Sequence, residues 1–128
     1  MSENNEMREL KTIQKRNKLN KVYAADEKGN GGANHTYLIF CGESEPETAD
    51  VSLIQFQDGP RNEKDSINGI LDTDLLEIVR DRLQSFQQGE YATRENAVAL
   101  THIETALLWM SKRVEDRYER GVLGTNKA

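Results

Sequence analysis

The stretch that decides the fold runs from Phe86 to Thr125 and reads FQQGEYATRENAVALTHIETALLWMSKRVEDRYERGVLGT. It predicts a turn followed by one long helix. Thr93 can accept a hydrogen bond from a free amide of the first turn, and Gly121 can end the helix in the left-handed conformation. The apolar residues between these two signals recur three or four positions apart, as on one face of a helix: Ala97, Leu100, Ile103, Leu107, Met110 and Val114.

A shorter amphipathic helix precedes the long one. The sequence DTDLLEIVRDRLQSFQQG is expected to start at a cap on Asp72 or Thr73 and to stop at Gly89. The joint from Gly89 to Ala92 is short, so the two helices should form an antiparallel hairpin.

Upstream of the hairpin, runs of β-forming residues alternate with turn-forming loops, and they predict three strands at 19–25, 35–42 and 51–57. The predicted fold class is therefore α+β, a small antiparallel sheet followed by a helical hairpin. The expected organisation is a tail or short helix at 1–17 and one domain at 18–128, with the sheet at 18–58, a loop at 59–71, the hairpin at 72–121 and a C-terminal tail at 122–128.

Composition limits the partners. The chain has 128 residues, 36% of them hydrophobic and 30% charged, and a net charge of −5. A modest core makes self-association a sensible expectation, and an acidic chain does not suit a long polyanion such as DNA. The single cysteine, Cys41, cannot form an internal disulfide and is expected in the core. No apolar run is long enough to span a membrane, and no signal peptide is recognised, so we expect an intracellular protein.

Catalytic signatures are missing from the sequence. His35 and His102 are the only histidines and stand 67 positions apart, without a metal-binding or nucleophile motif around them. We therefore predict no catalytic residue, no metal site, no cofactor and no enzymatic activity.

The arginines are more informative. Arg113, Arg117 and Arg120 are spaced four and three apart, so they project from one side of the long helix. They could form ion pairs with the interleaved acids, for example Asp116 with Arg113 or Arg120, or they could clamp a phosphate. A second possible clamp consists of Arg61 in the long loop and Arg94 at the helix start, where free amides already favour an anion.

Helix geometry restricts how such a ligand could bind. Asn96 and Arg113 are 17 residues apart in the predicted helix, a separation of about 25 Å at 1.5 Å per residue. A nucleotide-sized ligand can contact both only if two long helices from different chains run antiparallel, as in an isologous dimer. Phe86 would then offer a stacking face for a base.

The sequence resembles the phage Thoeris anti-defence sponge family, which is related to a phage anti-CBASS sponge. The resemblance covers roughly residues 18–126, and its most specific parts are the segments FQQGEYATRENAVALTH and RGVLGT. It implies a protein that sequesters the nucleotide messenger of a bacterial immune sensor, here glycocyclic ADP-ribose made by a TIR-domain enzyme, in the cytoplasm of the infected host.

The family's ligand residues fall on matching positions of this chain. The resemblance implies a cyclic ADP-ribose pocket between protomers, formed by Phe86, Asn96, Arg113 and Arg117. Arg61 and Arg94 match the arginines of a cyclic trinucleotide site that some members carry in a hexamer.

Two further interpretations stay open. The chain could instead be a hairpin-shaped interaction protein that inhibits a host immune protein by direct contact, with its arginines in surface ion pairs. It could also degrade the messenger, although no histidine or metal cluster supports this.

Overall fold

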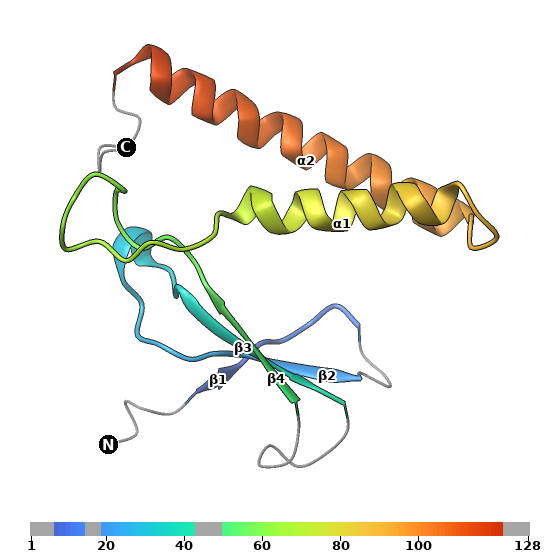
Figure 1. The fold of residues 1–128 in the computed structure, drawn as a ribbon, viewed down its shortest axis with the longest axis horizontal. Coiled ribbons are helices and arrows are strands. Elements are labelled where there is room, and N and C mark those ends of the chain that lie inside the picture. Colours follow the sequence, from blue (N-terminus) through green and yellow to red (C-terminus); the bar gives the residue numbers. More distant parts are fainter. Residues whose placement is uncertain (1–6, 15–18, 43–49, 122–128) are drawn as a thin grey trace. The chain divides into compact units, whose positions relative to one another are not determined.

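The computed structural model describes residues 7–14, 19–42 and 50–121 of the chain (Figure 1). The chain divides into two compact units, Met1–Gly69 and Ile70–Ala128. The first unit contains the strands and the second contains both long helices. The predicted order, an antiparallel sheet followed by a helical hairpin, is confirmed.

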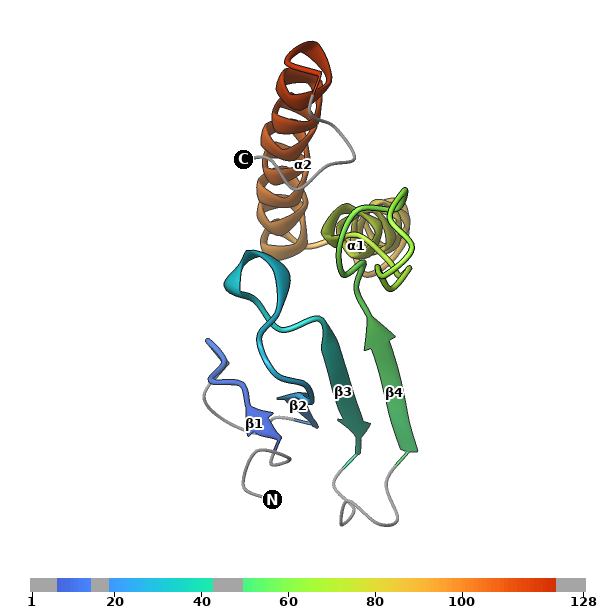
Figure 2. The ribbon, with the colours of Figure 1, turned by 90° about the vertical axis from the view of Figure 1, so that its left-hand side faces the viewer.

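The first unit is a four-stranded antiparallel sheet in the order β1-β2-β3-β4 (Figure 2). Each strand pairs with the next one along the chain, so all the connections join neighbouring strands. A short 3₁₀ turn, η2, lies between β2 and β3. The bounds of these elements are Arg8–Glu9 for β1, Asn20–Ala24 for β2, Asn30–Gly32 for η2, Thr36–Cys41 for β3 and Asp50–Gln55 for β4.

The extra strand, β1, differs from the prediction of a tail or a short helix at 1–17. Arg8 and Glu9 pair with Ala24 and Tyr23 of β2. The Arg8 guanidinium also donates to the Asn34 side chain at 2.6 Å. Nothing in the local pattern marks this strand, because two charged residues at a sheet edge show no alternation.

The sheet carries apolar side chains on both faces. Tyr23 and Phe40 pack on one face with ring centroids 5.4 Å apart, and Tyr37 meets Phe56 on the other at 5.6 Å. Phe40 and Ala24 are nevertheless the only buried hydrophobic residues in the described part of the chain. Leu53 of β4 is 65% exposed. The core is therefore small for a chain of this length.

The second unit is the predicted hairpin of α1 (Asp72–Gln87) and α2 (Arg94–Glu119). Thr93 caps α2 as predicted, since its hydroxyl accepts from the Asn96 amide at 3.0 Å. The residue after α2, Arg120, is followed by Gly121 with φ of 73°, as the C-cap prediction requires. The cap of α1 was predicted wrongly: it is Leu71, whose amide donates to the Asp74 carboxylate at 2.8 Å.

The two helices differ in length, and α2 runs past the start of α1 in Figure 1. The α2 helix has 26 residues and α1 has 16. The extra ten residues extend about 15 Å at the rise of an α-helix. On this overhang, Val114 and Tyr118 continue the apolar stripe but are 44% and 68% exposed.

An ion pair connects the two helices of the hairpin. The Arg80 guanidinium of α1 contacts the Glu104 carboxylate of α2 at 2.9 Å and Glu77 of its own helix at 3.4 Å. The hydrogen bond to Glu104 raises the pKa of Arg80 above its ordinary value. Neither helix in the described residues is long and apolar enough to cross a membrane.

Candidate functional site

Phe86 lies at the joint end of the hairpin, in the last turn of α1. Its ring meets the edge of the Tyr91 ring, with centroids 6.5 Å apart. The Arg82 guanidinium lies 5.3 Å from the centre of the same ring, at cation–π distance. Phe86 is half-buried and Tyr91 is 69% exposed. This end of the hairpin therefore presents aromatic rings next to a positive charge.

Asn96 belongs to the same end. It lies in the first turn of α2, and its side-chain amide donates to the Tyr91 carbonyl at 3.3 Å. The residue before α2 is fixed as well, because the Thr93 amide donates to the Gln87 side chain at 3.0 Å. Phe86 and Asn96 thus both contact Tyr91, and the structure brings this predicted pair together.

The predicted arginine pair lies toward the other end of α2. Arg113 is exposed, whereas Arg117 is buried with 8% exposure. Asp116 pairs with Arg120 at 3.2 Å, as the ion-pair interpretation anticipated. Arg113 makes no ion pair with any residue in the described ranges, so the alternative pair with Asp116 is not observed.

The two pairs are far apart on one chain. The α2 helix is continuous from Arg94 to Glu119. Asn96 and Arg113 are therefore separated by about 25 Å along its axis. One chain by itself cannot bring all four predicted residues around a ligand the size of a nucleotide.

Arg61 lies on the loop that follows β4 and is exposed. Its Nε atom donates to Gln57 Oε1 at 3.0 Å and its Nη2 atom donates to the Gly69 carbonyl at 2.9 Å. Arg94 is exposed at the first position of α2. Arg61 and Arg94 belong to different units, and their pairing in one site stays a prediction.

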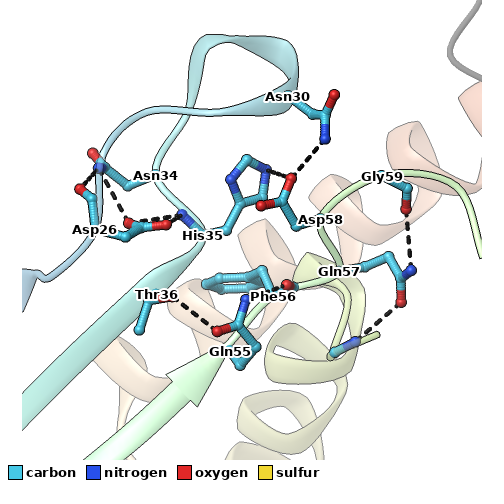
Figure 3. A network of polar contacts seen from close by, with 11 residues as sticks. Asp26, Asn30, Asn34, His35, Thr36, Gln55, Phe56, Gln57, Asp58 and Gly59 are labelled. Atoms are coloured by element: carbon cyan, nitrogen blue, oxygen red, sulfur yellow. Dashed lines mark hydrogen bonds and ion pairs between the residues drawn. The ribbon is translucent and has the colours of Figure 1, made fainter. Parts of the chain in front are cut away.

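A polar network at the end of the sheet was missed by sequence reasoning (Figure 3). His35 is buried, and its Nε2 atom lies 3.8 Å from Asp58 Oδ1. The Asn30 amide donates to the same carboxylate oxygen at 2.7 Å. The network connects the loop between β2 and β3 to the segment after β4. The structural role predicted for His35 fits this burial, and His102 is exposed on α2.

Asp26 organises the other side of the same loop. Its carboxylate accepts from the His35 amide at 3.1 Å and from the Asn34 side chain at 3.3 Å. Partial burial raises the pKa of Asp26, but hydrogen bonds from the His35 and Thr36 backbone and from Asn34 outweigh it, so the pKa lies below its ordinary value. Asp26 thus acts as a charged acceptor for the turn into β3.

A sheet unit followed by a helical hairpin with an overhanging second helix defines a class of small α+β protein. The model of the family described as Acb2/Tad1, hairpin domain, matches residues 49–115, so the chain belongs to this family. The resemblance drawn from the sequence is thereby confirmed. The match includes five of the six predicted site residues, and Arg117 lies two positions beyond it.

A relative of the chain is "Thoeris anti-defense 1" of Bacillus phage SBSphiJ7, which is 44% identical over 77 residues. The aligned part is 60% of this chain and 54% of that protein, so the chain spans about half the length of the relative.

Proposed function

We propose that this protein is a phage anti-defence sponge that acts in the cytoplasm of the infected host. It binds the immune messenger of a Thoeris system without chemical change, so that the effector is never activated. The name of the relative, Thoeris anti-defense 1, supports the Thoeris assignment. The ligand is glycocyclic ADP-ribose, which offers phosphates to arginines and a base to an aromatic ring.

The observation that carries this proposal is the separation of the two residue pairs along the helical hairpin. Phe86 and Asn96 offer an aromatic ring and an amide at one end, and Arg113 and Arg117 offer guanidinium groups toward the other. These are the chemical groups that a nucleotide with phosphates requires. Because about 25 Å separates Asn96 from Arg113, the pocket needs two chains with antiparallel α2 helices.

The overhang of α2 supports such an assembly. Val114 and Tyr118 expose apolar surface next to Arg113 and Arg117, where α1 of the same chain is too short to cover them. In a two-fold pair of chains, the joint end of the partner hairpin covers this stripe. Each dimer then contains two identical pockets.

Sequestration also requires tight binding. A sponge acts by stoichiometry, and nanomolar capture corresponds to about 12 kcal/mol. Arginine–phosphate contacts are stronger in an enclosed pocket than on an open helix surface, because the lower dielectric constant there screens the charges less. An inter-chain pocket supplies the enclosure.

A second ligand class is part of the proposal. Arg61 and Arg94 form a site for a cyclic trinucleotide or a related cyclic dinucleotide, made where chains meet in a hexamer. This activity would extend the protein's action to CBASS defence. Arg61 supports it, because its guanidinium is exposed yet oriented by two hydrogen bonds.

The test is a calorimetric titration of glycocyclic ADP-ribose into the wild-type protein and two variants. Arg113→Ala with Arg117→Ala should lose at least 100-fold in affinity, since charge-assisted bonds contribute about 1.5–3 kcal/mol each. Lys112→Ala removes an exposed charge from the same turn and should bind like the wild type. Ligand recovered unchanged after heat denaturation would exclude degradation.

Mixing two defective proteins tests the inter-chain pocket directly. Phe86→Ala and the double arginine variant should each bind poorly by themselves. A refolded mixture should regain wild-type pockets, because a mixed dimer joins the intact Phe86 of one chain to the intact arginines of the other. No recovery would argue against a shared pocket.

The alternative is a hairpin-shaped interaction protein that inhibits an immune protein by direct contact. The exposed Leu108 and Trp109 of α2, at 71% and 66%, favour it. Absence of binding to glycocyclic ADP-ribose and to cyclic oligonucleotides at micromolar concentration would support this alternative over the sponge.

A further inference from the structure

Gln57 is the centre of the loop between β4 and α1. Its Oε1 atom accepts from Arg61 Nε and from the Gly69 amide, both at 3.0 Å. Its Nε2 atom donates to the Gly59 carbonyl and to Asn68 Oδ1, both at 3.1 Å. A primary amide has two acceptor positions and two N–H donors. Gln57 therefore uses its full hydrogen-bonding capacity inside this one loop.

Arg61 is oriented by this arrangement. Its Nε atom bonds to Gln57 and its Nη2 atom bonds to the Gly69 carbonyl at 2.9 Å. These two atoms share one edge of the planar guanidinium, whose five N–H groups have a fixed geometry. The outer end, with Nη1 and the second hydrogen of Nη2, remains available on an exposed side chain. Such a fork matches two oxygens of a phosphate.

The rest of the loop is also fixed. Asp58 and Ile67 exchange two backbone hydrogen bonds at 2.8 Å, and Pro60 is buried. Asp58 is held from its side chain by Asn30 and His35 (Figure 3). At Gly69, an added Cβ atom would overlap the Gln55 carbonyl, so the chain passes β4 at a distance that only glycine permits. The acceptors for Arg61 are therefore held in place.

We propose that Gln57 is a positioning residue that holds the Arg61 guanidinium by its inner edge, so that the outer fork faces a phosphodiester of the second ligand. This inference rests on the proposed function, in which Arg61 binds a cyclic trinucleotide. A free arginine would lose rotamer freedom when the ligand binds. Gln57 removes most of that cost beforehand, and thereby raises affinity without touching the ligand.

The first measurement needs no ligand. In the free protein, the Nε–H of Arg61 should give a slowly exchanging NMR signal, assigned by its loss in Arg61→Gln. Gln57→Met keeps the side-chain size but removes the amide, and the signal should disappear. Gln57→Glu keeps two acceptor oxygens and should retain it. The matched control is Gln55→Met, since Gln55 bonds to Thr36 and Phe56 and not to Arg61.

The second measurement is the affinity for a cyclic trinucleotide. Gln57→Met should bind about two- to tenfold more weakly, as expected when one long side chain must be ordered by the ligand. Gln55→Met should leave the affinity unchanged. Neither variant should alter the titration with glycocyclic ADP-ribose, which uses the hairpin, and a melting curve checks that each variant is folded.

Each outcome is decisive. If the Arg61 signal persists in Gln57→Met, or if that variant binds the trinucleotide like the wild type, Gln57 does not position Arg61. If the wild-type protein binds no cyclic trinucleotide, the second ligand of the proposed function is wrong and so is the phosphodiester in this inference. The NMR result would then still report whether Gln57 orients Arg61.

Discussion

Single residues at the end of the sheet decide how its loops are held. Asp26 accepts from the backbone of His35 and from Asn34, and Asn34 accepts in turn from Arg8 of β1. His35 is buried beside Asp58, and its Nδ1 atom has no hydrogen-bond partner in the described residues. None of these contacts follows from spacing along the chain, because the partners lie 8 to 26 positions apart.

Asp26 should make stability depend on pH. Its pKa is lowered in the folded protein, so its contribution is present above the unfolded value, about 3.9, and is lost as the pH falls through that value and the folded pKa. Asp26→Asn should therefore be less stable than the wild type at pH 7, and the difference should shrink at pH 3. Urea unfolding at the two pH values measures this. The matched variant is Asp81→Asn, which removes one exposed carboxylate from α1 and so controls for the change in net charge.

Gly69 should not tolerate a side chain. Gly69→Ala places a methyl group against the Gln55 and Phe56 carbonyls, and should destabilise the protein by about 1–3 kcal/mol. The control is Gly89→Ala, where the nearest atom, the Ser85 carbonyl oxygen, lies 4.0 Å from an added Cβ. Thermal unfolding of both variants measures the difference. Equal melting temperatures would contradict the close approach of Gly69 to β4.

At the scale of elements, the helices follow their local signals closely. The apolar spacing, the Thr93 cap and the Gly121 stop each depend on residues only a few positions apart in sequence, and α2 starts and ends where they indicate. The start of α1 differs, because Asp74 supplies the carboxylate that holds the Leu71 amide. Strand β1 was not predictable, since its pairing with β2 is non-local.

The contribution of the Thr93 cap to the stability of α2 should be measurable. Thr93→Ala removes the hydroxyl that accepts from the Asn96 amide at 3.0 Å, and should cost about 1 kcal/mol. It should also increase hydrogen exchange in the first turn, where Asn96 lies. Thr105→Ala is the control, because the Thr105 hydroxyl donates to the Thr101 carbonyl inside the helix and not to a group at its end. A similar loss in both variants would mean that the hydroxyl at the cap has no special role.

For the whole molecule, the described residues leave much apolar surface exposed. Phe40 and Ala24 are buried, whereas Leu53, Leu108, Trp109 and Tyr118 are each more than 60% exposed. This exposed apolar surface is what the proposed association of two chains would bury. The sequence suggested this through its 36% hydrophobic content.

Assembly should depend on the overhang of α2. Val114→Glu with Tyr118→Glu places charges on its exposed apolar stripe. We expect the wild type to sediment as an oligomer and this variant to sediment as a smaller species that binds glycocyclic ADP-ribose poorly. Val98→Glu is the control: Val98 has similar exposure, 42% against 44% for Val114, but sits nearly opposite on a helix of 3.6 residues per turn. If Val98→Glu reduced assembly as much as the double variant, the overhang would not be part of the interface.

The sequence by itself determined the α+β class, the hairpin and the family, because caps, periodicity and short motifs are local properties of the chain. It also put Arg113 and Arg117 toward one end of the long helix and Phe86 across the hairpin turn from its other end. Only the tertiary structure decided that β1 pairs with β2, that Arg117 is buried while Arg113 is exposed, and that Gln57 holds Arg61. These features depend on contacts between residues that are distant in sequence, and such contacts produce no periodic pattern or local motif from which they could be predicted.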